Sequence, residues 1–417
     1  METPMMRAAT GASVVLVAAL LAAGDVATTT GLDWPQWRGP VRDGVSRETG
    51  LLPAWPDGGP PEVWRATGVG AGYSSMAIAG GRLYTLGARG DTEYLIVLDA
   101  ATGRKVWEAA NGRRFRNDRG DGPRSTPTVD GPRVFVLGSS GDLSAFDAGS
   151  GARVWSVNVL REFGGTNANW GLSESPLVVD DRIVVNAGGR GASVVALRKS
   201  DGRPIWKTES DGAAYSSAVV AEAGGVRQAV VFTSRRVIGV HLDDGRLLWE
   251  YASVSNRVAN IATPIVRGDR VFVSSDYGTG AALLRLARAG EGVAATEVWF
   301  SRNMRNHHSS SVLVGDHLYG FSSAILTAMR FDTGEVAWRD RSVGKGSLVA
   351  ADGRLYLFSE DGVAGLAEIT AEGYRERGRF RLASTGVLPT WSHPVVSNGR
   401  LYLRDQDTIY AYDVRAR

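Results

Sequence analysis

The chain has 417 residues, 43% of them hydrophobic, and a formal net charge of +3. This near balance of charge argues against a nucleic-acid partner, because such a partner selects for a concentrated excess of Lys and Arg. Cysteine is absent from the sequence, which excludes disulfides, thiolate metal sites, covalent haem attachment and acylation of a lipoprotein cysteine. Glycine and tryptophan are unusually frequent, with 53 and 12 copies, and both recur in one repeated motif.

Residues 1–24 have the parts of a secretory signal peptide. Arg7 precedes an apolar run over residues 12–23, which ends in small residues, and this order predicts cleavage after Gly24. The alternative is an uncleaved anchor, although the run is shorter than the ~20 residues that a membrane span needs. We expect an exported monomer, periplasmic or secreted, whose mature chain has no membrane span.

Residues 25–58 show no regular hydrophobic period and contain the stretch "DWPQWRGPVRDGVS" at 33–46. We expect an irregular strap on the surface of the domain that follows. Trp34 and Trp37 would pack against that domain; the alternative is that their two indoles bind carbohydrate.

A tryptophan recurs every 39 to 51 residues, at Trp64, Trp107, Trp155, Trp206, Trp249, Trp299 and Trp338. It ends a motif such as "LDAATGRKVW" at 98–107. There Asp99 can accept hydrogen bonds from the turn amides, and Gly103 can take the positive φ that other residues avoid. Trp107 would then begin an outermost strand and wedge between neighbouring blades.

A second pattern lies between the tryptophans and recurs eight times. It is a Ser/Thr/Pro-rich strand start, a tight turn and another strand, as in "STPTVDGPRVFVLG" at 125–138 and "SHPVVSNGRLYLRD" at 392–405. Short alternating runs of this kind, four to each repeat, are typical of a β-propeller. We therefore predict an all-β, eight-bladed β-propeller with four-stranded blades over 59–417. The strand in 59–68 would complete the blade formed by 392–413 and close the ring.

The repeated motif resembles the PQQ-type (pyrroloquinoline quinone-like) propellers, whose quinoprotein dehydrogenases carry an Ala-x-Asp-x-x-Thr-Gly-x-x-x-Trp docking motif. Two blades match it well, at Asp99, Thr102, Gly103 and Trp107 and at Ala145, Asp147, Gly151 and Trp155. Later blades match more loosely, and the blade at 363–380 lacks the tryptophan. The resemblance covers nearly the whole mature chain and implies the propeller fold.

The resemblance also implies two kinds of relative. Some members are dehydrogenases that hold PQQ and Ca²⁺ in the channel, and others are similar to the lipoprotein scaffold of outer-membrane assembly, which binds no cofactor. The dehydrogenases usually place a vicinal disulfide against the quinone and are longer. A chain without cysteine cannot form that disulfide.

The loops that lead into the innermost strands of a propeller gather on one face, and in this sequence they are rich in polar and aromatic residues. We predict that they bind a small polar or anionic ligand at the channel mouth; the alternative is a hydrated structural plug. The candidate residues are Tyr73, Arg124, Asn169, Trp170, Glu174, Tyr215, Asn260, His307, His308, Lys345, Trp391 and His393.

A quinone with calcium would need planar stacking, cations for its carboxylates and oxygen ligands for the metal. Trp170 or Trp391 could stack, and Arg124 and Lys345 could meet carboxylates. The calcium ligands would be Glu174, Asn169 and Asn260. No aspartate stands out as the general base that hydride removal from an alcohol requires.

His307 and His308 are adjacent, and adjacent strand residues point to opposite faces. We therefore expect at most one of them in the channel and no shared metal; a zinc site would need a partner such as His393.

Three functions stay open on the sequence. The first is a non-catalytic binding or assembly propeller of the cell envelope, with envelope protein partners or a small ligand. The second is a PQQ- and calcium-dependent oxidoreductase acting on an alcohol or sugar. The third, carbohydrate binding or cleavage, rests on the rim aromatics alone.

Overall fold

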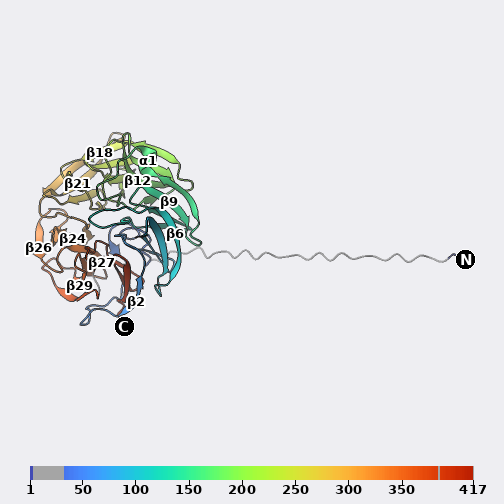
Figure 1. Cartoon of the computed structure of the whole chain (residues 1–417). Coiled ribbons are helices and arrows are strands. Elements are labelled where there is room, and N and C mark those ends of the chain that lie inside the picture. The colour runs from blue at the N-terminus through green and yellow to red at the C-terminus, as the bar shows by residue number, and fades with distance from the viewer. Residues whose placement is uncertain (3–31, 384–385, 417) are drawn as a thin grey trace.

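The computed structural model describes residues 1–2, 32–383 and 386–416. The predicted signal peptide lies outside these residues except for its first two. Eight sheets follow one another round a ring, and the chain colour in Figure 1 runs round that ring from blue to red. The predicted eight-bladed β-propeller with four-stranded blades is confirmed.

In blades 1 to 4 each sheet uses four consecutive antiparallel strands. They are β3 (Ala77–Ala79), β4 (Arg82–Arg89), β5 (Thr92–Asp99) and β6 (Lys105–Arg113); β7 (Thr128–Asp130), β8 (Arg133–Leu137), β9 (Asp142–Asp147) and β10 (Arg153–Asn158); β11 (Leu177–Val179), β12 (Arg182–Gly189), β13 (Ala192–Arg198) and β14 (Pro204–Thr208); and β15 (Val219–Ala223), β16 (Val226–Phe232), β17 (Val237–His241) and β18 (Leu247–Tyr251).

Blades 5 to 7 continue the order, and blade 8 combines both ends of the propeller. They are β19 (Ile265–Arg267), β20 (Arg270–Ser275), β21 (Gly280–Ala289) and β22 (Gly292–Ser301); β23 (Val312–Val314), β24 (His317–Ser322), β25 (Ile325–Arg330) and β26 (Val336–Asp340); β27 (Gly346–Ala351), β28 (Arg354–Ser359), β29 (Val363–Glu368) and β30 (Glu376–Arg381), with β1 (Val45–Ser46) added; and β31 (Val395–Ser397), β32 (Arg400–Asp405), β33 (Thr408–Asp413) and β2 (Glu62–Thr67).

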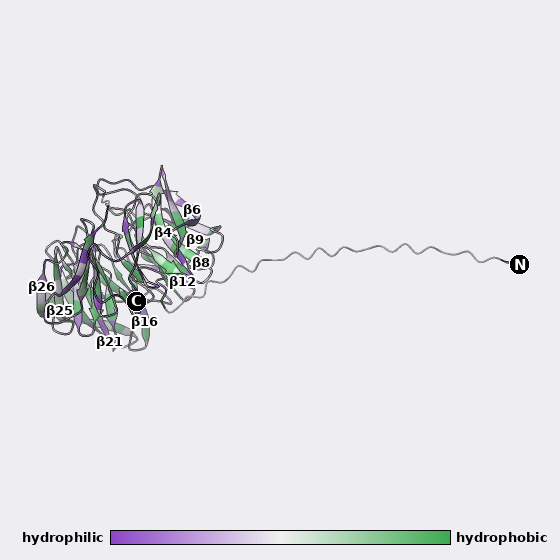
Figure 2. Ribbon diagram, turned by 90° about the horizontal axis from the view of Figure 1, so that it is seen from below, coloured by the Kyte–Doolittle hydropathy of each residue, from purple (hydrophilic) through white to green (hydrophobic). Residues whose placement is uncertain are grey.

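The middle strands of each blade are buried between the neighbouring blades, and their sequences are apolar at consecutive positions. In β8 four of the five residues are buried, whereas the outermost strand β10 has none that is fully buried. A sheet covered on both faces needs apolar side chains on both, which is why these runs do not alternate. In the hydropathy colouring of Figure 2, green apolar stretches run along the strands, with purple stretches among them.

The ring closes as the sequence predicts. β2 pairs antiparallel with β33, with Trp64 opposite Ala411. A second tie is Arg404 of blade 8, which is fully buried and donates to the carbonyl oxygens of Ser74 (3.0 Å) and Leu86 (2.6 Å) in blade 1. These hydrogen bonds satisfy backbone acceptors that would otherwise be buried without partners.

A β-bulge precedes the tryptophan position in the outermost strand of every blade. In blade 2, Arg153 pairs with Phe146 and Trp155 with Ala145, so that Val154 is the extra residue. The same register shift occurs in the other seven blades. A bulge bends the strand and interrupts its free edge, which discourages edge-to-edge pairing between molecules.

Most of these tryptophans then lie on the turn of the following blade. The indole of Trp64 covers Gly103, where an added Cβ would be 2.6 Å from the ring, and its Nε1 donates to the Ala100 carbonyl at 3.1 Å. Asp99 holds the turn by accepting from the Thr102 amide at 2.8 Å, and Gly103 has a φ of 72°. The same contact recurs for Trp107 on Gly151, Trp155 on Gly202, Trp206 on Gly245 and Trp299 on Gly334.

Blade 7 lacks its own tryptophan, and Trp55 from the N-terminal segment takes that place. Trp55 is 6% exposed and packs on Tyr356 with ring centroids 5.9 Å apart. Trp64 packs on Tyr402 of its own blade at the same 5.9 Å. Gly378 stands where the other blades have tryptophan, and a Cβ there would lie 2.6 Å from that of Trp55. The indole is therefore supplied from a distant part of the sequence.

The N-terminal strap, residues 32–58, differs from our expectation of a surface strap. Part of it enters the central channel, where β1 pairs parallel with β27 and Trp34 bridges Ile78 of blade 1. Arg38 and Arg42 are each 3% exposed, at the inner edges of the blades. Arg42 donates to the carbonyls of Ser175, Pro176 and Ala218, and Arg38 donates to that of Ser311. The strap thus fills the channel that the eight innermost strands would leave open.

The one helix among the described residues is α1 (Val159–Phe163), a single turn capped by Asn158 and ended by Gly164. No helix in that part of the chain has the length and apolar character of a membrane span.

We expect Gly103→Ala to destabilise the fold more than Gly81→Ala. Both glycines have a φ near +72°, but Gly81 has no atom within 4 Å of an added Cβ. Both variants should lose about 1–2 kcal/mol from the left-handed backbone, and Gly103→Ala about 1–3 kcal/mol more from overpacking against Trp64. Urea unfolding measures the difference; equal losses would show that the indole contact is dispensable.

We expect Trp55→Ala to lower the free energy of unfolding by about 3–5 kcal/mol, the usual range for a buried large aromatic. Trp170→Ala, which removes a half-buried loop tryptophan, should cost less. Thermal and urea unfolding of both variants test this. A loss no larger for Trp55→Ala would mean that this residue does not act as the tryptophan of blade 7.

Candidate functional site

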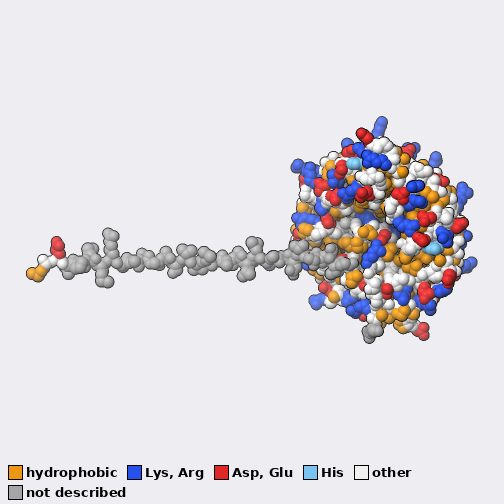
Figure 3. Space-filling view, turned by 180° about the vertical axis from the view of Figure 1, so that it is seen from behind, with side chains coloured by type: hydrophobic (Ala, Val, Ile, Leu, Met, Phe, Trp, Pro, Cys, Tyr) orange, Lys and Arg blue, Asp and Glu red, His pale blue; other side chains and the backbone are white. Residues whose placement is uncertain are grey.

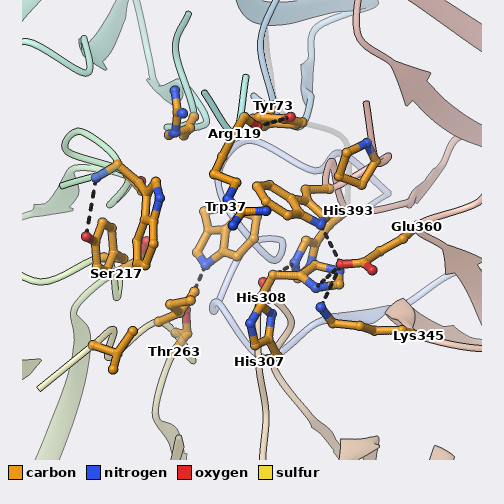
Figure 4. A pocket seen from close by; sticks show the side chains of 18 of the residues that line it. Trp37, Tyr73, Arg119, Ser217, Thr263, His307, His308, Lys345, Glu360 and His393 are labelled. Atoms are coloured by element: carbon orange, nitrogen blue, oxygen red, sulfur yellow. Dashed lines mark hydrogen bonds and ion pairs between the residues drawn. The ribbon is translucent and has the colours of Figure 1, made fainter. Parts of the chain in front are cut away.

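A cavity of about 580 Å³ lies at the mouth of the channel. We use the name rim loops for the eight segments that lead into the innermost strands, and each of them contributes to its wall. Their lining residues are Tyr73, Arg119, Arg124, Trp170, Ser173, Tyr215, Ser217, Val258, Ile261, Thr263, His307, His308, Lys345, Pro389, Trp391 and His393. The ring closure brings these distant segments together (Figure 4).

Two further lining residues come from a second set of loops. Tyr277 lies in the turn between β20 and β21, and Glu360 lies in the turn between β28 and β29. In a meander of antiparallel strands, the turn after the second strand returns to the face where the first strand began. This alternation could have identified both residues from the sequence, but we considered only the loops before the innermost strands.

The floor of the cavity is Trp37 of the strap, in the middle of Figure 4. Its Nε1 donates to the hydroxyl of Thr263 at 2.8 Å, and its ring lies 4.5 Å from that of His393. The strap therefore separates the cavity from the packed channel beneath it.

The structure brings together nine of the twelve predicted site residues. They are Tyr73, Arg124, Trp170, Tyr215, His307, His308, Lys345, Trp391 and His393.

The three predicted calcium ligands do not line the cavity. Asn169 is exposed, whereas Glu174 is 1% exposed and accepts from the Asn186 amide at 2.6 Å. Asn260 is also buried, and its side chain bonds to Asn256 and to the carbonyl of Thr233. Both buried side chains are engaged with the protein itself.

A polar cluster centres on Glu360. Its Oε1 accepts from Lys345 Nζ at 2.9 Å and from Trp391 Nε1 at 2.6 Å, and lies 3.4 Å from Nδ1 of His308. His308 belongs to blade 6, Lys345 and Glu360 to blade 7 and Trp391 to blade 8. Figure 4 shows His308, Lys345 and Glu360 close together. The charge-assisted contacts fix the position of the carboxylate at the wall of the cavity.

Our expectation that His307 and His308 point to opposite faces is not met, because both line the cavity. They lie before β23 in an irregular loop, where strand alternation does not apply. Burial lowers the pKa of His307, and it lowers that of His308 well below its ordinary value; the Lys345 ammonium adds to both shifts. Both rings are therefore neutral at pH 7.

Aromatic pairs form the opposite walls. The rings of Trp170 and Tyr215 are 5.7 Å apart, and those of Tyr73 and Trp391 are 4.9 Å apart. Such walls offer flat apolar surfaces on which a planar ligand can stack.

The two arginines of the cavity differ in how far their guanidinium groups are already engaged by the protein. The Arg124 guanidinium donates to the carbonyls of Gly120 and Gly122 and lies over the Tyr73 and Phe115 rings. Arg119 is exposed, and Figure 4 shows its side chain extending over Trp37 into the cavity. Within the described chain no carboxylate forms an ion pair with Arg119, so that a ligand can use its charge.

The residues that line the cavity suit a quinone of the PQQ type but not the calcium ion that would accompany it. The aromatic walls and three cations suit a planar polycarboxylate. Calcium prefers six to eight oxygen ligands, but Glu360 is the one carboxylate among the described residues that line the cavity, and it faces Lys345 and two histidines. The predicted ligands Asn169, Glu174 and Asn260 lie elsewhere. The residues present therefore do not fit a calcium ion.

A closed ring of eight blades, joined by tryptophans on Asp/Gly turns around a mouth cavity, defines a PQQ-type β-propeller. The chain matches the family model described as "Outer membrane protein assembly factor BamB" over residues 57–162 and 98–340, more than half of its length. It belongs to this family.

Two curated relatives bear the same name. The protein of Yersinia pestis is 24% identical over 246 residues, which are 56% of this chain and 61% of that protein. The protein of Shewanella oneidensis is 26% identical over 379 residues, 82% of this chain and 86% of that protein. The match to the Yersinia protein thus spans about three fifths of its length.

Solved structures share the fold. BamB from Moraxella catarrhalis superposes with a TM-score of 0.62 at 14% identity, over 85% of this chain and 98% of that one. A europium-containing methanol dehydrogenase superposes with a TM-score of 0.65 at 11% identity, over 90% of this chain and 89% of that one. The assembly factor and the dehydrogenase superpose about equally well on this chain. The fold therefore does not show which of the two functions this chain has.

Glu174 should make the stability of the protein depend on pH. Burial raises the pKa of its carboxyl to about 8, so between pH ~4.5 and 8 the folded state holds a proton that the unfolded state has lost. Stability due to Glu174 is therefore lost as the pH rises through this window. The difference in unfolding free energy between the parent and Glu174→Gln should change by about 1.4 kcal/mol per pH unit.

Urea unfolding at pH 5, 6 and 7 measures this slope. Asp316→Asn changes an exposed carboxylate and serves as the control. Its difference from the parent in unfolding free energy should not change with pH over this range. A pH-independent difference for Glu174→Gln would mean that Glu174 is ionised beside Arg42.

Proposed function

We propose that this protein is a non-catalytic binding propeller of the cell envelope, and that its working surface is the face formed by the rim loops. The cavity on that face would take a small anionic ligand with a planar or ring portion. The observation that carries the proposal is the convergence of aromatic walls and three cationic side chains on one cavity against a single carboxylate.

The charge of the lining supports an anion over a cation. Lys345 is neutralised by Glu360 at 2.9 Å, and the histidines are neutral at pH 7. Arg119 and Arg124 are left as positive charges, and Arg119 also has free hydrogen-bond donors. Guanidinium groups bind carboxylates and phosphates through paired hydrogen bonds, so we propose a ligand that carries one of these groups.

The envelope setting is proposed from the family. The relatives are named outer membrane protein assembly factors, and the predicted signal peptide would deliver this chain to the same compartment. We propose that envelope proteins are its macromolecular partners and that it acts without catalysis. The charges on the molecule are of mixed sign, as Figure 3 shows for one face, so the proposed selectivity rests on the cavity and not on a general surface field.

Titration of Arg119→Ala beside Arg116→Ala tests the ligand. Both arginines are exposed and lie in the same rim loop, but Arg116 pairs with Asp91 and does not line the cavity. A panel of aromatic carboxylates and phosphates is first screened on the parent protein. Arg119→Ala should weaken the best binder roughly 10- to 100-fold, the value of a charge-assisted hydrogen bond, and Arg116→Ala should leave it unchanged. Equal weakening by both variants, or no binder at all, would contradict the proposal.

Titration with PQQ, with and without Ca²⁺, tests the oxidoreductase alternative. Calcium should not strengthen PQQ binding, because the oxygen donors for it are missing from the lining. Calcium-dependent binding with dye-linked oxidation of an alcohol would instead establish the dehydrogenase function. Arg82→Ala, on the opposite face, serves as the control for binding elsewhere on the molecule.

A further inference from the structure

We propose that His307, His308 and Glu360 bind one divalent transition-metal ion of the zinc type, at the wall of the cavity. Each residue offers one ligand atom, and these three atoms lie within 4.8 Å of one another. His307 and His308 come from the rim loop of blade 6, whereas Glu360 comes from the second set of loops in blade 7. The contact between neighbouring blades therefore assembles the cluster.

The spacing is close to what a metal requires. Zinc binds His nitrogen at about 2.0–2.1 Å with tetrahedral geometry, which places neighbouring ligand atoms roughly 3.3 Å apart. His308 Nδ1 and Glu360 Oε1 are already 3.4 Å apart. The ligand atom of His307 needs to approach by no more than about 1.5 Å, which a half-exposed loop side chain can do by rotating.

Three of the four ring nitrogens of His307 and His308 are buried and lack a hydrogen-bond partner among the described residues. The His308 side chain is 8% exposed, and neither Nδ1 nor Nε2 has a hydrogen bond with the described chain; the same holds for Nδ1 of His307. Buried polar atoms in native proteins are almost always satisfied. A metal ion would satisfy Nδ1 of His307 and one nitrogen of His308 together.

The hydrogen bonds that other residues make to His307 and Glu360 resemble the outer hydrogen bonds of a metal site. Tyr277 Oη lies 3.1 Å from His307 Nε2; if Nε2 carries the proton and donates to this hydroxyl, Nδ1 presents its lone pair to the cluster. Lys345 and Trp391 both donate to Oε1 of Glu360 and hold this oxygen 3.4 Å from Nδ1 of His308. Outer hydrogen bonds of this kind fix the tautomer and the orientation of metal ligands.

The donor set selects the class of metal. Two imidazoles and one carboxylate suit zinc, copper or nickel, whereas calcium prefers oxygen ligands alone. Three protein ligands leave a fourth position, as in zinc sites that bind an exchangeable molecule, and here it would face the cavity. We infer that the proposed anionic ligand completes the coordination there; this last step rests on the proposed function.

Metal titration of the full-length protein without a polyhistidine tag tests the site. After chelator treatment, the parent should bind one Zn²⁺ per chain by calorimetry, and Co²⁺ should give visible d–d absorption. His308→Ala and Glu360→Gln should each weaken Zn²⁺ binding roughly 100-fold or more, since losing even an outer partner costs about 10- to 100-fold. His317→Ala, which changes a histidine on the opposite face, should have no effect.

Tyr277→Phe tests how His307 is held. It keeps the ring and removes only the hydroxyl that contacts Nε2, so Zn²⁺ binding should weaken about 10- to 100-fold while the melting temperature stays that of the parent. Binding that is absent from the parent, or equally reduced by His317→Ala, would overturn the metal site.

The anion titration separates the two proposals. If Zn²⁺ binds at one site but the carboxylate panel binds neither the apo nor the zinc form, the proposed ligand fails and the metal site stands. If the panel binds the apo protein through Arg119 and Zn²⁺ does not bind, the reverse holds.

Discussion

The innermost strands of the eight blades all face one channel, and the backbone groups along their inner edges need hydrogen-bond partners. The N-terminal strap provides them. Its strand β1 pairs with β27, and the guanidinium groups of Arg38 and Arg42 reach carbonyls of blades 3, 4 and 6. Because a buried backbone acceptor without a partner is costly, the ring and the strap stabilise each other. The cavity depends on the same arrangement, since Trp37 of the strap is its floor.

Neighbouring blades contact one another through the same arrangement of a tryptophan on a turn, with small differences from blade to blade. A bulge in the outermost strand turns a tryptophan onto the Asp/Gly turn of the next blade, and the positive φ of glycine lets the chain pass beneath the indole. Blade 7 shows that the fold requires an indole in this space between the blades, and that the indole need not come from the repeated motif of the same blade. There Trp55 comes from the strap, about three hundred positions earlier in the chain than Gly378.

The chemistry of the cavity arises between blades. Glu360 of blade 7 holds Lys345 and Trp391 and lies 3.4 Å from a ring nitrogen of His308 in blade 6. Burial keeps the two adjacent histidines neutral. A low local dielectric strengthens polar contacts between buried groups. The lining therefore combines positive charge for an anion with imidazoles for a metal, while its described residues include one carboxylate, too few for a calcium site.

The sequence by itself determined the eight blades, their turns and the closure by the strand around Trp64, because these depend on local patterns that repeat. Asp99, Gly103 and Trp107 carry that pattern within ten residues. The sequence also placed nine of the candidate residues on the face that carries the cavity, since every rim loop precedes an innermost strand.

The path of the strap, the place of Trp55 and the pairing of His308 with Glu360 were decided only by the tertiary structure. The sequence of the strap shows no hydrophobic periodicity from which its path could be predicted, because its partners are backbone atoms of many blades. Glu174 and Asn260 turn inward to neighbours that no local spacing reveals. His307 and His308 share a cavity because their loop is irregular, and the direction of a loop side chain is set by what packs around it.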